Sequence, residues 1–249
     1  MNRNGRMGED GMVAATRTSS AWERYAWAAG ILYVIALVAV TVVELLGGGL
    51  SQNASAAKIA NTLYDHRGRL LVITYLSVVY AAMFLIYLAK LYDLLRRDTD
   101  RTRFLGSLVL AGGALFIALH AVSDIGIFGL LGAKLASFGF HHDQGVSYAL
   151  YLVTYGLDSV GDVFGSLFAF ATGVLVIGSG VLPRWLGWVS ILAGILFFLQ
   201  GFGLGGVTAS FGLVLDLIGF VLFLIFVLVS SVILLTRKNA LPHTAGGTE

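Results

Sequence analysis

Cysteine is absent from the chain, and charged residues are scarce. Without cysteine there is no disulfide, no thiolate chemistry and no Cys-ligated zinc or iron–sulfur site. Charged residues make up 12% of the 249 residues, about half the share found in soluble domains. The net charge of +2 is too small to indicate a nucleic-acid partner. Because 57% of the residues are hydrophobic, the composition indicates an integral protein of the lipid bilayer.

Long apolar runs predict an all-α, polytopic membrane bundle. A helix needs about 20 apolar residues to cross about 30 Å of hydrocarbon, and the backbone groups of a lipid-embedded segment must be paired internally. Six runs meet this requirement and predict six transmembrane helices in three hairpins: Ala26–Leu46, Leu70–Leu91, Phe104–Leu131, Val160–Leu182, Trp185–Leu204 and Ala209–Leu235. We expect the transmembrane domain over residues 25–236, between disordered cytoplasmic tails at 1–24 and 237–249. The first run lacks a small-residue cleavage site, so we expect it to be retained.

Two shorter segments do not fit as spans. Asn53–His66 has apolar residues at positions 57, 59, 60 and 63 and predicts a short surface helix. Val146–Leu157 is apolar for only 12 residues, which is short for a span. It is either an interfacial segment or an extension that makes the fourth helix long and tilted. We favour the extension, because only Gly156 and Gly161 interrupt the run.

The basic residues predict the orientation. If the N-terminus is inside, 12 of the 16 Lys and Arg residues lie in cytoplasmic segments, as the positive-inside rule requires. All four tryptophans then lie at the cytoplasmic interface, where aromatic residues anchor membrane helices. The sequence therefore predicts a multi-pass protein of the bacterial inner membrane with both termini in the cytoplasm.

Two short strings recur along the chain and predict an internal threefold repeat. The odd-numbered runs share a small-Gly-apolar-Leu-aromatic string, at Ala29–Tyr33, Gly112–Phe116 and Ala193–Phe197. The even-numbered runs share D-x-x-G, at Asp65–Gly68, Asp162–Gly165 and Asp216–Gly219. A duplication would place the central glycines of each set at equivalent depths. The alternative is coincidence, because Gly, Ala and Leu are common in membrane helices.

The turn between the fourth and fifth runs carries a family resemblance. It reads Gly180-Val181-Leu182-Pro183-Arg184-Trp185-Leu186-Gly187. This turn, together with the hydropathy pattern along most of the chain, resembles the bacterial membrane family catalogued as domain of unknown function 4386. The resemblance implies a polytopic bacterial membrane protein and supplies no activity and no catalytic residues.

Ionisable residues inside the spans are the candidate site residues, since each costs about 2.5–3.5 kcal/mol at the bilayer centre on insertion scales. They are Glu44, His120, Asp124, Asp158, Asp162 and Asp216. Counted at about 1.5 Å per residue, the acids of four different helices converge on the outer membrane boundary. His120 lies one turn deeper than Asp124 on the same helix face. We expect at least two of Asp124, Asp162 and Asp216 to point into the bundle above His120.

Three interpretations of these residues are open. Each acid could cap its own helix and face headgroup water, because carboxylates complement helix N-termini. The acids could together bind a cation or a proton from the outside. His120, Asp124, Asp162 and Asp216 could instead hold a divalent metal, completed by His66, His141 or His142, since histidines with a carboxylate suit zinc. The chain has no H-E-x-x-H spacing that would favour the metal.

The sequence favours a non-catalytic function. No serine-hydrolase elbow and no Walker-type loop is present. We expect an integral membrane protein that binds a small ligand, a lipid, a cation or a partner subunit in the bilayer, with transport as one use of such a site. The alternative is a metal-dependent intramembrane hydrolase that acts on a lipid substrate. No cofactor other than a divalent metal is indicated, and the catalytic residues of such an enzyme would be unknown.

Overall fold

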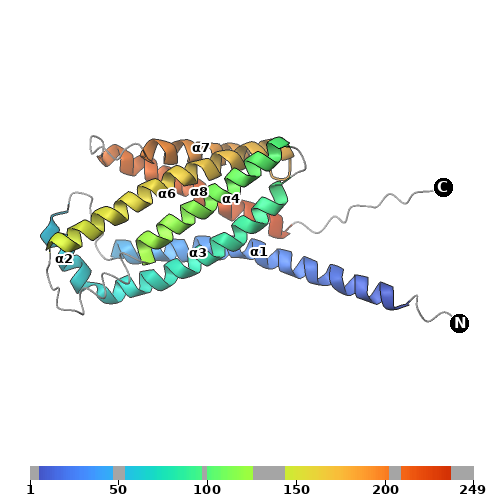
Figure 1. Cartoon of the computed structure of the whole chain (residues 1–249), viewed down its shortest axis with the longest axis horizontal. Helices are drawn as coiled ribbons and strands as arrows, with labels where there is room; N and C mark the ends of the chain where they lie inside the picture. The colour runs from blue at the N-terminus through green and yellow to red at the C-terminus, as the bar shows by residue number, and fades with distance from the viewer. Residues whose placement is uncertain (1–5, 47–53, 97–99, 126–143, 202–208, 237–249) are drawn as a thin grey trace.

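A computed structural model describes residues 6–46, 54–96, 100–125, 144–201 and 209–236 (Figure 1). Within these residues the secondary structure is entirely helical. The helices are α1 (Arg6–Leu46), α2 (Ala56–Asp65), α3 (Arg67–Leu95), α4 (Asp100–Ala121), α6 (Gln144–Ser179), α7 (Arg184–Gly201) and α8 (Ala209–Thr236). The predicted all-α class is therefore confirmed for the described part of the chain.

Five of these helices are long and apolar enough to cross a bilayer. The candidate spans are Trp22–Glu44, Gly68–Leu95, Asp100–Ile125, Gln144–Ser179 and Leu217–Thr236. The sixth predicted span corresponds to α7, which is apolar but shorter, over Arg184–Gln200. The chain is accordingly a multi-pass helical membrane protein.

Two helix boundaries depart from simple spans. Val146–Leu157 is part of α6, so the predicted extension of the fourth helix is confirmed and the interfacial alternative is wrong. α1 begins at Arg6, although the sequence predicted disorder through residue 24. Extending an existing helix fixes one residue per new hydrogen bond, and the Ala, Met, Glu and Arg of this stretch favour the helical state. Residues 1–5 and 237–249 lie outside the described part.

The long helices run side by side in one bundle, and α2 lies at the end away from the start of α1 and the end of α8 (Figure 1). α6 packs most extensively against α7 and α4, and α1 packs against α3. α2 is amphipathic, and it buries Ile59, Ala60 and Leu63 against the bundle. We call this end of the molecule the α2 end; the opposite end holds the α3–α4 and α6–α7 connections.

Six aromatic rings form the centre of the bundle, one from each long helix. We call them the aromatic layer: Tyr33 (α1), Phe84 (α3), Phe116 (α4), Phe168 (α6), Phe197 (α7) and Phe223 (α8). Phe223 contacts each of the other five rings, with centroid distances of 5.4 to 6.2 Å. These separations are typical of favourable aromatic pairs. The layer fixes the relative positions of all six helices.

Glycine permits the closest contact between α6 and α7. A Cβ atom added at Gly173 would lie 2.6 Å from the carbonyl oxygen of Gly187, and one added at Gly187 would lie 2.9 Å from that of Gly173. Small residues at membrane helix interfaces allow such backbone approach. The Ser190 hydroxyl strengthens the same interface by donating to the Ala169 carbonyl over 2.8 Å.

The two recurring strings behave differently in the fold. The last residue of each odd-numbered string belongs to the aromatic layer, as a repeat would require. In the even-numbered strings, Gly165 precedes Phe168 by three residues, whereas Gly68 precedes Phe84 by sixteen, although Phe84 and Phe168 are in contact. At about 1.5 Å per residue, the two glycines differ in depth by about 20 Å. The D-x-x-G string before α3 therefore does not mark an equivalent position.

Candidate functional site

Polar side chains gather between the aromatic layer and the α2 end of the bundle. They come from three helices, and we call them the polar cluster: Ser77 and Tyr80 of α3, His120 of α4 and Asp124 just beyond it, and Asp158 and Asp162 of α6. Each helix brings its polar residues to the buried side with helical spacing. His120 and Asp124, like Asp158 and Asp162, are four residues apart and share a helix face.

The ring of His120 lies between a backbone carbonyl and a carboxyl group. Its Nδ1 lies 2.9 Å from the carbonyl oxygen of Phe116, and its Nε2 lies 3.5 Å from Oδ1 of Asp162. A carbonyl only accepts hydrogen bonds, so Nδ1 carries a hydrogen. A bare Nε2 facing a carboxylate would set two lone pairs against each other, so a second proton lies between them. Asp162 is buried, at 6% exposure, whereas the side chain of His120 is 25% exposed.

Asp124 is bound by hydroxyl groups of the neighbouring helix. Its Oδ2 accepts hydrogen bonds from the Tyr80 hydroxyl over 2.6 Å and from the Ser77 hydroxyl over 3.2 Å. The shorter distance is typical of hydrogen bonds to a charged oxygen. These two bonds join α3 to the end of α4 at the level of the cluster.

Asp158 is the member of the cluster with an unsatisfied atom. Its Oδ1 is buried and has no hydrogen-bond partner within the described residues. The charges that face it come from His120 and Asp124, from Asp162 one turn along α6, and from Glu44 of α1. A buried polar atom without a partner costs about 1–3 kcal/mol, and neighbouring carboxylates add repulsion. The site therefore favours a proton or a cation at this oxygen.

A glycine makes room for the histidine. A Cβ atom added at Gly161 would lie 2.6 Å from two atoms of the His120 ring, so the ring occupies the space where a side chain would otherwise stand. Gly161 lies between Asp158 and Asp162 in the sequence, and the two acids therefore flank the ring. The Ser123 hydroxyl donates to the carbonyl of Thr154 over 3.4 Å and ties the end of α4 to α6.

The cluster lies part-way along α3 and α6. α3 begins ten residues before Ser77, and α6 begins 14 residues before Asp158, which corresponds to about 15 and 21 Å of helix toward the α2 end. Asp124, by contrast, is next to the last residue of the candidate span Asp100–Ile125. The level of these acids relative to the membrane boundary stays a prediction.

Two further acids were predicted to belong to the site. Glu44 lies near the end of α1, where its side chain is exposed, and it interacts electrostatically with Asp124 and Asp158. Asp216 lies on α8 seven residues before Phe223, and Asp162 lies six residues before Phe168. Because those rings are in contact, the two acids share a depth. The side chain of Asp216 is outside the described part of the structure.

The metal hypothesis has no geometric support in the described residues. No three histidine, aspartate or glutamate side chains converge there in an arrangement that would hold a metal ion. His66 lies at the junction of α2 and α3, whereas His141 and His142 are outside the described residues. His120, Asp124 and Asp162 accordingly form hydrogen bonds and an ion pair with protein groups.

Sequence reasoning missed the hydroxyl partners on α3. Ser77 and Tyr80 carry no charge at neutral pH, so a search for ionisable groups inside spans passed over them. Their spacing held a signal, because buried residues of α3 recur at positions 73, 77, 80, 84, 87, 91 and 95. This is the pattern of one helix face, and two polar residues on a face that packs inward need polar partners.

Comparison with known protein families gives one match. The model of the family described as a domain of unknown function, DUF4386, matches residues 28–235. The chain belongs to this family. The match covers all six long helices, which confirms the resemblance drawn from the turn before Trp185 and from the hydropathy pattern. Comparison with curated proteins and with solved structures gave no match.

Proposed function

We propose that this membrane protein binds an exchangeable proton in the polar cluster, and that proton binding serves a non-catalytic function such as transport. The observation that carries the proposal is the buried Oδ1 of Asp158, which has no hydrogen-bond partner among the described residues. A protonated carboxyl group would neutralise the charge that the surrounding helices do not compensate.

The charges around Asp158 support a proton over a fixed ion pair. One histidine, His120, faces the carboxyl groups of Asp124, Asp158 and Asp162. Even a fully charged imidazolium would leave negative charges uncompensated within the bundle. Uncompensated charge in a span is costly, so protons or a cation must balance it. Chains of neighbouring Asp, Glu and His side chains are also the usual components of proton relays in membranes.

The test compares Asp158→Asn with the parent protein. Asparagine has the shape of a neutral aspartic acid, so it removes the titration with little change in packing. We expect the thermal unfolding midpoint of the purified parent to fall as the pH rises above about 4, the ordinary pKa of an aspartate carboxyl, because ionising a buried, unpaired carboxyl destabilises the folded state. The Asp158→Asn variant should lose part of this fall. Infrared spectra should show a protonated carboxyl band in the parent that is absent from the variant.

Asp65→Asn serves as the matched control, because Asp65 is exposed at the end of α2. The control should follow the parent at every pH. If Asp158→Asn keeps the full pH dependence and the same carboxyl band, the proposal is wrong. A stabilisation by sodium, potassium or a divalent metal at constant ionic strength, lost in Asp158→Asn, would identify a metal cation instead of a proton.

We further propose that α7 crosses the bilayer, which gives six spans and places both termini in the cytoplasm. Its 18 residues correspond to about 27 Å, close to the hydrocarbon thickness of about 30 Å. α7 also packs along α6, which is a candidate span. Reporter fusions at Glu249 and in the segment 47–53 should report opposite sides of the membrane. The same side for both would contradict this topology.

The threefold repeat is proposed only for the helices that carry the small-Gly-apolar-Leu-aromatic string, which are α1, α4 and α7. Their aromatic positions meet in one layer, and the glycines of the strings lie one turn before them. Among the helices that carry the D-x-x-G string, α6 and α8 match in the depth of their Asp and Gly, but α3 does not. An experimental structure in which the hairpins α1–α3, α4–α6 and α7–α8 superpose would support a duplication. Helix directions that cannot be superposed would exclude it.

A further inference from the structure

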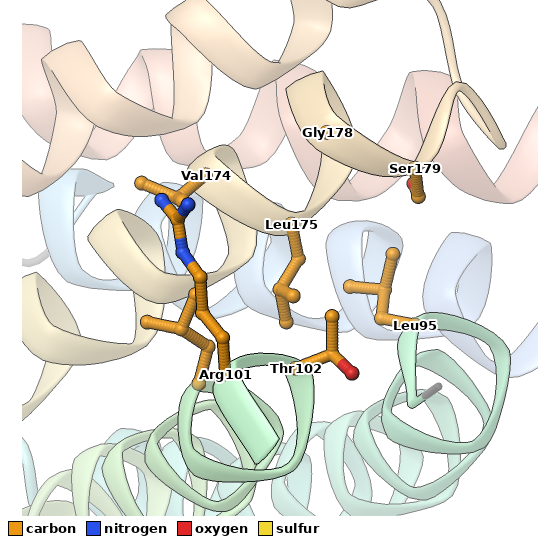
Figure 2. A pocket seen from close by; sticks show the side chains of 8 residues that line it. Leu95, Arg101, Thr102, Val174, Leu175, Gly178 and Ser179 are labelled. Carbon is orange, nitrogen blue, oxygen red and sulfur yellow. The ribbon is translucent and has the colours of Figure 1, made fainter. Parts of the chain in front are cut away.

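A pocket of about 220 Å³ lies at the end of the bundle opposite α2. It is formed where α3 ends, α4 begins and α6 ends (Figure 2). The side chains that line it are Leu95, Arg101, Thr102, Leu105, Val174, Leu175, Gly178 and Ser179. This pocket is far from the polar cluster along the bundle, and the proposed proton site does not use it.

The pocket combines one cation with an apolar wall. Figure 2 shows the Arg101 side chain reaching from α4 toward Val174 of α6, with Leu175 beside it and Leu95 beyond Leu175. Leu95 and Leu175 are almost fully buried, at 1% and 4% exposure. Arg101 is exposed and forms no ion pair within the described residues. A ligand that fills the pocket therefore meets a guanidinium at one side and hydrocarbon at the other.

The position of the pocket selects a lipid over a free anion. Arg101 is the second residue of the candidate span Asp100–Ile125, so it lies at the level where the span leaves the hydrocarbon. Phospholipid headgroups occupy the same level. The backbone N–H groups in the first turn of α4 carry partial positive charge, although the exposed Asp100 in that turn reduces it. The apolar lining gives no reason to favour a fully hydrated inorganic ion.

We propose that this pocket binds the headgroup of an anionic phospholipid, with Arg101 contacting the phosphate and the partly exposed Leu105 and Val174 contacting the glycerol and the first carbons of the acyl chains. Basic pockets between transmembrane helices are suited to such headgroups. The volume is below the range of about 300–1,000 Å³ for pockets that enclose whole drug-sized ligands. It accommodates a headgroup, while the acyl chains extend along the apolar surface of the bundle.

The same end of the bundle carries other basic residues that would attract anionic lipid without a specific site. Arg96 lies at the end of α3 with its guanidinium 5.8 Å from the ring centre of Tyr92, and Arg184 begins α7. A specific site and general attraction make different predictions. General attraction depends on the number of charges, whereas the pocket depends on Arg101 and on free space beside Gly178.

The experiment measures retained lipid by native mass spectrometry. The full-length protein is purified in detergent and incubated with phosphatidylglycerol or phosphatidylcholine, with and without inorganic phosphate. We expect the parent to retain phosphatidylglycerol in preference to phosphatidylcholine. Arg101→Gln should lower this retention about five-fold, the equivalent of one basic residue near an anionic surface. Arg184→Gln is the matched control, because it removes the same charge at the same end but outside the pocket lining, and it should lower retention less than Arg101→Gln does.

A second variant tests the pocket without changing charge. A Cβ atom added at Gly178 would contact nothing within 4 Å, so Gly178→Leu should fold and fill part of the pocket. We expect it to lower phosphatidylglycerol retention as Arg101→Gln does. Equal losses in Arg101→Gln and Arg184→Gln, or no loss in Arg101→Gln and Gly178→Leu, would overturn the proposal. Displacement of the lipid by millimolar phosphate would also overturn it, because the ligand would then be a free anion.

Discussion

The aromatic layer and the polar cluster are neighbours along the same helices, but they differ in how completely their atoms are satisfied. In the aromatic layer each ring is buried against others, and Phe223 contacts one ring from every other long helix. One to three turns farther along, the polar cluster leaves a carboxyl oxygen of Asp158 without a partner. The aromatic layer fixes the relative positions of the helices. The polar cluster contains an oxygen that lacks a hydrogen bond, which a proton or a ligand can supply.

The comparison also shows why the two regions occur together. A polar group inside a span has a defined partner only if the helices that carry it cannot slide or rotate. Phe116 and His120 are one turn apart on α4, and their ring centres lie 4.5 Å apart. The packed ring therefore supports the histidine that pairs with Asp162. Rigid packing directly below the cluster holds its geometry, and substitutions in the two regions should differ in kind.

The largest effect is expected from Phe223→Ala in the aromatic layer. Removing the ring that contacts five others leaves a cavity, and such substitutions cost about 3–5 kcal/mol. We expect a fall of roughly 6–20 °C in the unfolding midpoint in detergent, at about 2–4 °C per kcal/mol, with little change in pH dependence. Phe104→Ala is the control, because Phe104 is 63% exposed near the start of α4. A similar midpoint for both variants would show that the layer does not stabilise the bundle.

Gly173→Val tests the backbone approach of α6 to α7 and should rank second. The added Cβ would lie 2.6 Å from the Gly187 carbonyl oxygen, so the helices must separate, at a cost of about 1–3 kcal/mol. Gly178→Val lies on the same helix, where an added Cβ contacts nothing within 4 Å, and should leave the midpoint unchanged. The midpoints of both variants can be measured in one thermal series, and equal losses would mean that helix propensity rather than close contact is responsible.

The sequence predicted the helices better than the site because apolar runs are local and side-chain partners are not. The runs predicted the six long helices, and the lack of strong breakers in Val146–Leu157 predicted the length of α6. The pairing of His120 with Asp162 depends on the angle between α4 and α6 and on the missing side chain at Gly161, neither of which is encoded in spacing along one helix. The level of the acids relative to the membrane stays a prediction, because a 36-residue helix has no unique 20-residue span.

A double-mutant cycle on His120 and Asp162 tests whether the polar cluster acts as a unit. His120→Gln, Asp162→Asn and the double variant should be non-additive, because each single change leaves a buried group without its partner. We expect a coupling of about 1–2 kcal/mol. The comparison pair is Lys90 and Glu23, 3.0 Å apart with side chains 21% and 46% exposed, where about 0.2–1 kcal/mol is usual for exposed pairs. Additive effects for the buried pair would contradict the shared proton inferred from the ring geometry.

The smallest effect is expected from Tyr80→Phe, which removes one hydroxyl and keeps the ring. The Tyr80 hydroxyl donates to Asp124 over 2.6 Å, and loss of a hydrogen bond to a charged group costs about 1.5–3 kcal/mol at most. Here Ser77 still donates to the same oxygen over 3.2 Å, so we expect a loss below about 1 kcal/mol. Tyr75→Phe is the control, since Tyr75 is 73% exposed on the same helix. The loss should be greater at high pH, where Asp124 needs its donors, and should shrink at low pH. A loss that is independent of pH would assign Tyr80 to packing with the aromatic layer and would place the boundary between the two regions one turn closer to the α2 end.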